Sequence, residues 1–182
     1  RKGYTGIGEY SNRHHSEAYG IWASMLRRCY CPKHLAKQPT YIGCSVNPNW
    51  LNFQNFAEWF YKESNYEEGL HLDKDLLVQG NKVYGPEFCQ FVSREVNTIL
   101  VAHNSKRGNH MLGVWLDNRY GTFVASCNVC KGKSKHLGTF STEIEAHNAY
   151  KEAKYEAIKE LAYRQTNEIV KQSLLKWKIP TH

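Results

Sequence analysis

The chain contains 182 residues, enough for one ordinary domain or two small ones, and carries 24 Lys and Arg against 17 Asp and Glu. No apolar run approaches the roughly 18 residues of a membrane span, and no charged-then-apolar leader opens the chain. We therefore expect a cytoplasmic protein without a membrane partner. Six cysteines are too few for a secreted disulfide scaffold of this length.

The positive charge is concentrated in the C-terminal part of the sequence. Residues 1–100 contain 11 basic and 10 acidic side chains, whereas residues 101–182 contain 13 and 7. A basic region beside a nearly neutral one is typical of a protein whose basic region binds a polyanion while the other region has a different task. A basic protein without such a partner is the alternative.

The N-terminal half is predicted to contain two helices with aromatic residues. Apolar residues recur at helical spacing over residues 16–30, with Ser16 available as the helix cap. Residues 40–46 have the β-branched character of a short strand. Aromatic residues then follow a spacing of three and four over residues 50–62, which predicts a helix whose aromatic stripe is part of the core.

Residues 70–97 are predicted to form a short strand, a turn-rich loop and the start of a helix. Polar and apolar residues alternate at the beginning of this segment, which places His71, Asp73 and Asp75 on one face of the strand. The loop contains two turn signals rich in Gly, Asn and Pro. Strand, loop and helix would bring the two aspartates and Asn97 within reach of one another.

Oxygen ligands of this kind suit one divalent cation such as Mg²⁺, or Mn²⁺ in its place, held by one or two carboxylates and a substrate phosphate. The alternative is that Asp73 and Asp75 are solvated charges at a strand end. A structural zinc site is a further option, since one thiol pair has CxxC spacing, although Cys127 also fits as an inward residue of a strand. The thiols concerned are Cys29, Cys31, Cys44, Cys127 and Cys130.

The C-terminal half shows a cleaner pattern. A polar, basic segment at residues 103–112 is the predicted domain linker. The cap pair Ser141–Thr142 then precedes a helix with one face of small residues, and residues 163–182 add a second helix that docks on a domain or makes a dimer contact. Between linker and cap, three strands are predicted at residues 113–116, 122–129 and 136–140.

Three antiparallel strands with one covering helix leave the other face of the sheet bare. The expected inward residues are Val114, Leu116, Phe123, Ala125 and Cys127. The expected outward residues are Trp115, Asp117, Thr122, Val124, Ser126, Asn128 and His136. A Trp on an uncovered face indicates a binding partner. A three-stranded sheet fits the major groove of duplex DNA, where outward side chains reach the bases and nearby cations contact the phosphates. The cations concerned are Arg119, Lys131, Lys133 and Lys135.

The stretch from residue 113 to residue 153 resembles the Apetala-type, or plant ethylene-response-factor, DNA-binding domain. The matching residues are Gly113–Val114, Gly121, Phe123, Ala125, Leu137–Phe140, Thr142, Glu145–Ala146 and Ala149–Tyr150. The resemblance implies a sheet that lies in the major groove of double-stranded DNA. It places the DNA contacts at Trp115, Asp117, Tyr120, Thr122, Ser126, Asn128 and His136. Most of the arginines and tryptophans that the family has there are replaced in this chain.

Residues 71–97 resemble an HNH (ββα-metal) endonuclease core of the kind that phage-encoded and homing endonucleases join to such domains. The resemblance makes Asp73 and Asn97 metal ligands and makes Asn81 the residue that braces the loop. Lys74 stands where that family has its general-base His, and His71 is the nearby imidazole. A lysine, with a usual pKa of about 10.4, serves more readily as a cation on the phosphate than as a base.

We therefore predict an α+β protein with an HNH-like domain at residues 1–102, the linker, an Apetala-type domain at residues 113–162 and a C-terminal helix. One hypothesis is a sequence-directed, metal-dependent endonuclease or nicking enzyme. The second is a non-catalytic DNA-binding phage protein that regulates or interferes with the host. The third is an interaction protein that binds a host protein through its aromatic N-terminal half. If the chain is phage-encoded, its location is the cytoplasm of the infected bacterium.

Overall fold

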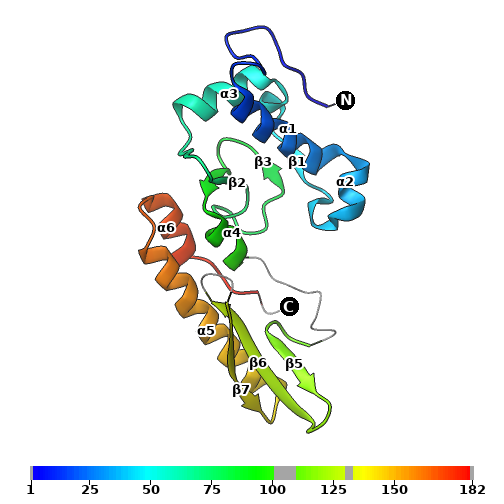
Figure 1. Cartoon of the computed structure of the whole chain (residues 1–182), viewed down its shortest axis with the longest axis vertical. Coiled ribbons are helices and arrows are strands. Elements are labelled where there is room, and N and C mark those ends of the chain that lie inside the picture. The colour runs from blue at the N-terminus through cyan, green and yellow to red at the C-terminus, as the bar shows by residue number, and fades with distance from the viewer. Residues whose placement is uncertain (1, 101–109, 130–132, 181–182) are drawn as a thin grey trace. The chain divides into compact units, whose positions relative to one another are not determined.

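A computed structural model describes residues 2–100, 110–129 and 133–180 of the chain (Figure 1). The described residues contain six α-helices and short strands, among them a three-stranded antiparallel sheet. The mixed α+β class expected from the sequence is therefore confirmed. The chain divides into two compact units, residues 1–92 and residues 93–182. None of the helices in the described part combines the length and the apolar character needed to cross a membrane.

The first unit begins with two helices. Helix α1 (Ser16–Tyr30) has the predicted bounds, but its cap residue is His15, whose side chain makes no capping hydrogen bond. Ser16 is thus the first helical residue and not the cap that the sequence predicted. Helix α2 (Pro32–Lys37) follows at once and begins with a proline, whose fixed φ suits the first helical position.

The second aromatic helix of this unit is shorter than predicted. A 3₁₀ turn, η2 (Pro48–Leu51), precedes helix α3 (Phe53–Lys62), and Asn52 separates the two. The Asn52 side chain accepts a hydrogen bond from the Gln54 backbone N–H at 3.1 Å, so it caps a new helix. The predicted strand at residues 40–46 is also shorter, because a 3₁₀ turn occupies its first part and only β1 (Ser45–Val46) is extended.

Three further short strands complete the first unit: β2 (His71–Asp73), β3 (Val83–Tyr84) and β4 (Gln90–Val92). β1 pairs with β3 in parallel, and β2 pairs with β4 in antiparallel register, with Asp73 opposite Gln90. The sequence analysis missed both β3 and β4. It also extended the β2 strand to residue 75, whereas the strand ends at Asp73.

The core of the first unit is largely aromatic. Phe53 and Phe56 are fully buried and Trp50 is 2% exposed, which confirms these residues of the aromatic stripe as core. Tyr61, at the end of the stripe, is 47% exposed, so its assignment to the core is wrong. The Trp22 indole N–H donates a buried hydrogen bond to the Trp50 carbonyl at 2.7 Å. Phe91 of β4 packs into the same cluster, so the short strands share the core of the helices.

The second unit contains the predicted sheet. Strands β5 (Val114–Asp117), β6 (Thr122–Val129) and β7 (Lys133–Phe140) pair in the order β5–β6–β7, all antiparallel. β7 begins three residues earlier than the sequence predicted, and a bulge lies between Ala125 and Ser126. Helix α5 (Glu143–Tyr163) covers one face of the sheet (Figure 1). Helix α6 (Glu168–Leu175) contacts α5.

The start of α5 has the capping pattern expected from the sequence. Thr142 accepts a hydrogen bond from the Glu145 backbone N–H, and the Glu145 side chain accepts one from the Thr142 N–H. Ala146 of this helix packs against Val114 and Ala125 of the sheet. A second cluster joins Cys127 to Tyr150 and Leu112, with Ile179 of the C-terminal tail against it. The inward positions Val114, Ala125 and Cys127 are therefore confirmed.

One outward prediction is wrong. Val124 is only 7% exposed, although its face of the sheet has no covering helix. Val124 lies on the central strand, and its register partners are Trp115 on β5 and Thr139 on β7. Direct cross-strand neighbours lie close enough to shield a small central side chain from water.

The boundary between the units bears on the predicted site. Helix α4 (Arg94–Leu100) belongs to the second unit, whereas the sequence analysis placed residues up to 102 in the first domain. Its Glu95 carboxylate forms an ion pair of 3.0 Å with Arg164 of the same unit. Residues 103–109 of the predicted linker lie outside the described residues.

Candidate functional site

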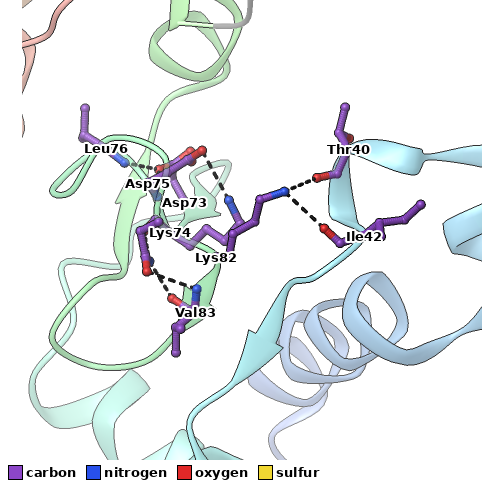
Figure 2. Close-up of polar contacts among 9 residues, drawn as sticks. Thr40, Ile42, Asp73, Lys74, Asp75, Leu76, Lys82 and Val83 are labelled. Atoms are coloured by element: carbon purple, nitrogen blue, oxygen red, sulfur yellow. Dashed lines mark hydrogen bonds and ion pairs between the residues drawn. The ribbon is translucent and has the colours of Figure 1, made fainter.

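The carboxylate at the end of β2 is used by the turn that follows. Asp73 Oδ1 accepts hydrogen bonds from the backbone N–H groups of Asp75 at 2.9 Å and Leu76 at 2.7 Å (Figure 2). This is the arrangement by which an aspartate stabilises a turn. Burial and the negative charge of Asp75 raise the pKa of Asp73 to about 6, although the two N–H groups act in the opposite direction.

Lys74 is buried beside this turn. It is 9% exposed, its Nζ lies 3.2 Å from Oδ2 of Asp75, and it lies 6.0 Å from the centre of the Tyr84 ring. The ammonium is thus already paired with a carboxylate in the structure. The predicted role of Lys74 as a phosphate clamp requires that this ion pair open.

Asn81 closes the loop between β2 and β3. Its two amide N–H groups donate to the carbonyl groups of Lys74 and Val83, each at 2.7 Å, and its Oδ1 accepts from the Val83 N–H at 3.1 Å. Lys82 next to it donates to the carbonyls of Thr40 and Ile42, at 3.3 and 3.2 Å (Figure 2). Because both amide N–H groups of Asn81 are used by the backbone, the residue holds the loop and has no N–H left for a phosphate.

The remaining predicted site residues of this stretch are His71 and Asn97. His71 is exposed on β2, opposite Val92. Asn97 lies on α4, so the predicted ligand pair Asp73 and Asn97 is divided between the two units. Among the described residues there is no group of three or more His, Cys, Asp or Glu that could hold a metal ion.

The carboxylate oxygens at the end of β2 and in the turn after it do not form a preorganised magnesium site. One oxygen of Asp73 accepts two backbone hydrogen bonds, and Asp75 faces the Lys74 ammonium. A divalent cation would have to compete with that ammonium for the same carboxylate.

The predicted zinc ligands can be examined in part. Cys130 lies outside the described residues, whereas Cys29, Cys44 and Cys127 are buried. Burial raises the pKa of the Cys29 thiol to about 12, with the neighbouring Cys44 acting in the same direction. The Cys29 thiol is therefore held in its neutral form in this environment.

The face of the sheet opposite α5 keeps several of its side chains exposed to solvent. Trp115 is 41% exposed, and Asn128 and His136 are also exposed. The register pairs Ser126 with His136 and Asn128 with Ser134, so these residues follow Trp115 along the same face. The sequence analysis missed Ser134 and Thr139 on this face. Alternation back from Phe140 would have found Thr139 but not Ser134, because the register shifts between the two pairs Ala125–Gly138 and Ser126–His136.

Four predicted contact residues have a different surrounding from that expected. Asp117, Thr122 and Ser126 are half-buried. Lys135 is exposed but pairs in register with the inward Cys127, so it lies at the edge of the sheet on the side that α5 covers. Lys131 and the side chain of Lys133 lie outside the described residues.

The turn between β5 and β6 holds an arginine in a fixed orientation. Arg119 Nε and Nη2 lie 3.2 and 3.0 Å from the two carboxylate oxygens of Asp117, and its backbone N–H donates to the same carboxylate. These hydrogen bonds from Arg119 lower the pKa of Asp117. The Arg119 side chain is 79% exposed, and the neighbouring Tyr120 is 75% exposed. A two-point pair of this kind orients the guanidinium for a further contact.

Comparison of the chain with family models, with curated proteins and with solved structures found no match. The two candidate sites therefore have to be judged by their geometry. At the end of β2, the fold uses the hydrogen-bonding groups of Asp73 and Asn81. On the open face of the sheet, Trp115, Asn128 and His136 are exposed.

Proposed function

We propose that the chain binds double-stranded DNA through the uncovered face of the β5–β6–β7 sheet. The observation that carries this proposal is the exposed Trp115, which stands with Asn128 and His136 on a sheet face that no helix covers. Apolar surface rimmed by polar residues is typical of an interaction site, and here polar residues of the same sheet face accompany Trp115.

The charge and the shape of this surface support DNA as the partner. Residues 101–182 contain 13 basic and 7 acidic side chains, and non-specific DNA affinity comes from such cations. β-strands can enter a DNA groove and place alternate side chains on base edges. Arg119 is exposed beside its pair with Asp117, and its remaining guanidinium N–H groups can donate to a guanine or a phosphate.

The exposed side chains have chemistry that suits the major groove. The Asn128 amide can pair with adenine through two hydrogen bonds, while His136 can donate to a base or a phosphate. The exposed Trp115 ring can contact the methyl group of thymine.

The test measures the affinity of the full chain for duplex oligonucleotides by fluorescence anisotropy. We expect Trp115→Ala to weaken binding by about tenfold, the loss typical of one important contact. Tyr155→Ala is the matched control, because Tyr155 is an aromatic residue of α5 with 50% exposure. An equal loss in both variants would show that the sheet face is not the interface.

A salt titration tests the electrostatic part of the proposal. Affinity should fall steeply as the salt concentration rises. Replacing Lys131, Lys133 and Lys135 with Gln should make the plot of log affinity against log salt concentration less steep, by about 0.9 for each phosphate contact removed. Lys159→Gln on α5 serves as the control for a cation outside the proposed interface. Binding that does not depend on salt would contradict the proposal.

Metal-dependent cleavage of the bound DNA is the second candidate function. The observation that favours it is the pair of neighbouring carboxylates, Asp73 at the end of β2 and Asp75 in the turn that follows. The opposing observation is the Lys74 ammonium on Asp75, which fits a scaffold that has no metal.

A nicking assay separates these two functions. Supercoiled DNA is incubated with the parent chain and with Asp73→Asn in magnesium or manganese. Asn keeps an oxygen that can accept the two turn hydrogen bonds, so a lost activity would report the charge and not the fold. Nicking by the parent that Asp73→Asn abolishes would establish cleavage. If neither protein nicks, or both nick equally, DNA binding is the function and Asp73 is structural.

A further inference from the structure

A cleft lies between the N-terminal arm and helix α1, entirely within the first unit. Its volume is about 470 Å³. Pockets that hold small molecules span about 300–1,000 Å³, so the cleft can take a ligand of nucleotide size. The lining residues that decide its chemistry are Lys2, Tyr19, Trp22, Arg27 and Tyr30.

The wall that the arm provides is held in place by hydrogen bonds. The Tyr4 N–H donates to the Leu51 carbonyl at 2.9 Å, and the Phe53 N–H donates to the Tyr4 carbonyl at 2.9 Å. The Gln54 side chain donates to the Thr5 carbonyl at 2.8 Å. A ligand would therefore meet a preformed wall, which lowers the ordering cost of binding.

Close packing also fixes the arm against α1. Gly3 has a φ of +92°, and a Cβ there would lie 2.5 Å from Leu26 Cδ1. Only glycine adopts this conformation without strain, so the arm approaches the helix more closely than other residues allow.

Of the four aromatic residues that line the cleft, Tyr4 belongs to the arm, and the other three rings are each held by contacts with the core of the first unit. The Tyr30 hydroxyl accepts a hydrogen bond from the Val46 N–H at 3.0 Å, and the Trp22 indole donates to the Trp50 carbonyl. Tyr19 packs edge-to-face on Phe53, with 5.2 Å between the ring centres. Rings held in this way keep their orientation when a planar ligand stacks on them.

The cleft is positively charged. Lys2 Nζ lies 4.5 Å from the centre of the Tyr30 ring, and Arg27 is exposed on α1. The described residues that line the cleft include no aspartate or glutamate. Cations beside aromatic rings are complementary to a flat aromatic group that carries a negative charge.

We propose that this cleft binds a nucleotide. The base stacks on Tyr4 and Tyr19, two lining rings that keep solvent-exposed surface, and the phosphate pairs with Lys2 and Arg27. The same chemistry is presented by a free nucleotide and by one nucleotide of a single DNA strand. The cleft belongs to the first unit and the sheet to the second, so this site is additional to the proposed duplex-binding surface.

The test titrates the full chain with AMP by calorimetry at low salt, with adenosine and inorganic phosphate as matched ligands. We expect AMP to bind at least about tenfold more tightly than either, because only AMP uses both halves of the cleft. A short single-stranded oligothymidylate is the second probe. Tighter binding of the oligonucleotide than of AMP would identify a DNA strand as the source, and the reverse order a free nucleotide. AMP that binds no better than adenosine or phosphate would overturn the proposal.

Variants locate the binding. Arg27→Gln should weaken AMP binding by about tenfold, as expected for a lost charge-assisted hydrogen bond. Lys37→Gln, an exposed cation of α2 that does not line the cleft, should bind as the parent does. Tyr19→Ala should also bind less, because it removes one of the lining rings.

A loss in Lys37→Gln as large as in Arg27→Gln would show that AMP binds non-specifically and would overturn the assignment. Duplex binding by Arg27→Gln should equal that of the parent, so the failure of either proposal can be recognised without the other.

Discussion

The two units use their polar side chains in different ways. In the first unit, the groups at the end of β2 contact the backbone of their own loop, as Asp73 and Asn81 do. In the second unit, Asn128 and His136 stand exposed on the face of the sheet. The same types of residue therefore hold a loop in one unit and form a surface in the other.

The difference follows from the lengths of the strands. The first unit has strands of two or three residues joined by long connections, whose backbone groups need side chains as partners. β6 and β7 of the second unit are eight residues each, and their backbone N–H and carbonyl groups form hydrogen bonds with one another along the antiparallel pair. The side chains on β6 and β7 are therefore not needed as hydrogen-bond partners for the backbone and can contact a ligand.

The largest expected effect is on the aromatic core. Phe56→Ala should lower the free energy of unfolding by about 3–5 kcal/mol, because Phe56 is fully buried. Phe123→Ala in the second unit should cost less, since Phe123 is half-buried. Urea unfolding, with hydrogen exchange of peptides from each unit, measures both losses. Equal losses would remove the contrast between the two cores.

The next effect tests the loop brace. Asn81→Ala removes three hydrogen bonds and leaves the Lys74 and Val83 carbonyls without this partner, so we expect a loss of about 2–3 kcal/mol of stability. Asn128→Ala on the exposed sheet face should stay within about 0.5 kcal/mol of the parent. If Asn128→Ala is the more destabilising variant, the assignment of structural and surface roles is reversed.

Asp73 should make stability depend on pH. Its folded pKa, about 6, lies above the ordinary carboxyl value, so its favourable contribution is complete below that ordinary value and is lost as the pH rises through about 6. Asp73→Asn lacks this loss. The free energy of unfolding of Asp73→Asn, taken relative to that of the parent, should therefore rise by about 1–2 kcal/mol from about pH 5 to about pH 8. Urea unfolding at both pH values measures the gain, and a stability difference that does not change with pH would contradict the raised pKa.

The smallest effect concerns the start of α5. Thr142→Ala removes the capping hydrogen bond to the Glu145 N–H and should cost about 1 kcal/mol. Thr142→Ser keeps a hydroxyl and should restore most of the loss. Hydrogen exchange in the first turn of α5 is the sensitive measurement. A loss that Ser does not restore would assign the effect to the methyl group and not to the cap.

The second unit was predictable from the sequence because its signals are periodic and local. Alternation identified the inward residues Val114, Ala125 and Cys127, and the Thr142–Glu145 spacing identified the helix start. The bulge after Ala125 and the shielding of Val124 were not predictable, since both depend on which residues stand opposite on neighbouring strands.

The first unit was predictable only where a helix carries a long apolar stripe, as in α1 and α3. The strands β3 and β4 were missed because strands of two and three residues have too short a pattern to recognise. The aromatic cleft was missed for a different reason. Tyr19 and Trp22 lie on the apolar stripe of α1, and nothing in that spacing shows that the arm leaves space beside them.

The sequence by itself determined the α+β class, the aromatic core, and the sheet with its covering helix, because hydrophobic periodicity and capping act over a few neighbouring residues. Only the tertiary structure decided what the polar residues do. It turned Asp73 and Asn81 toward their own loop, paired Lys74 with Asp75, and placed Lys2 and Arg27 at one cleft. Hydrogen bonds and charge pairs depend on distance and burial, which residue types and spacing do not specify.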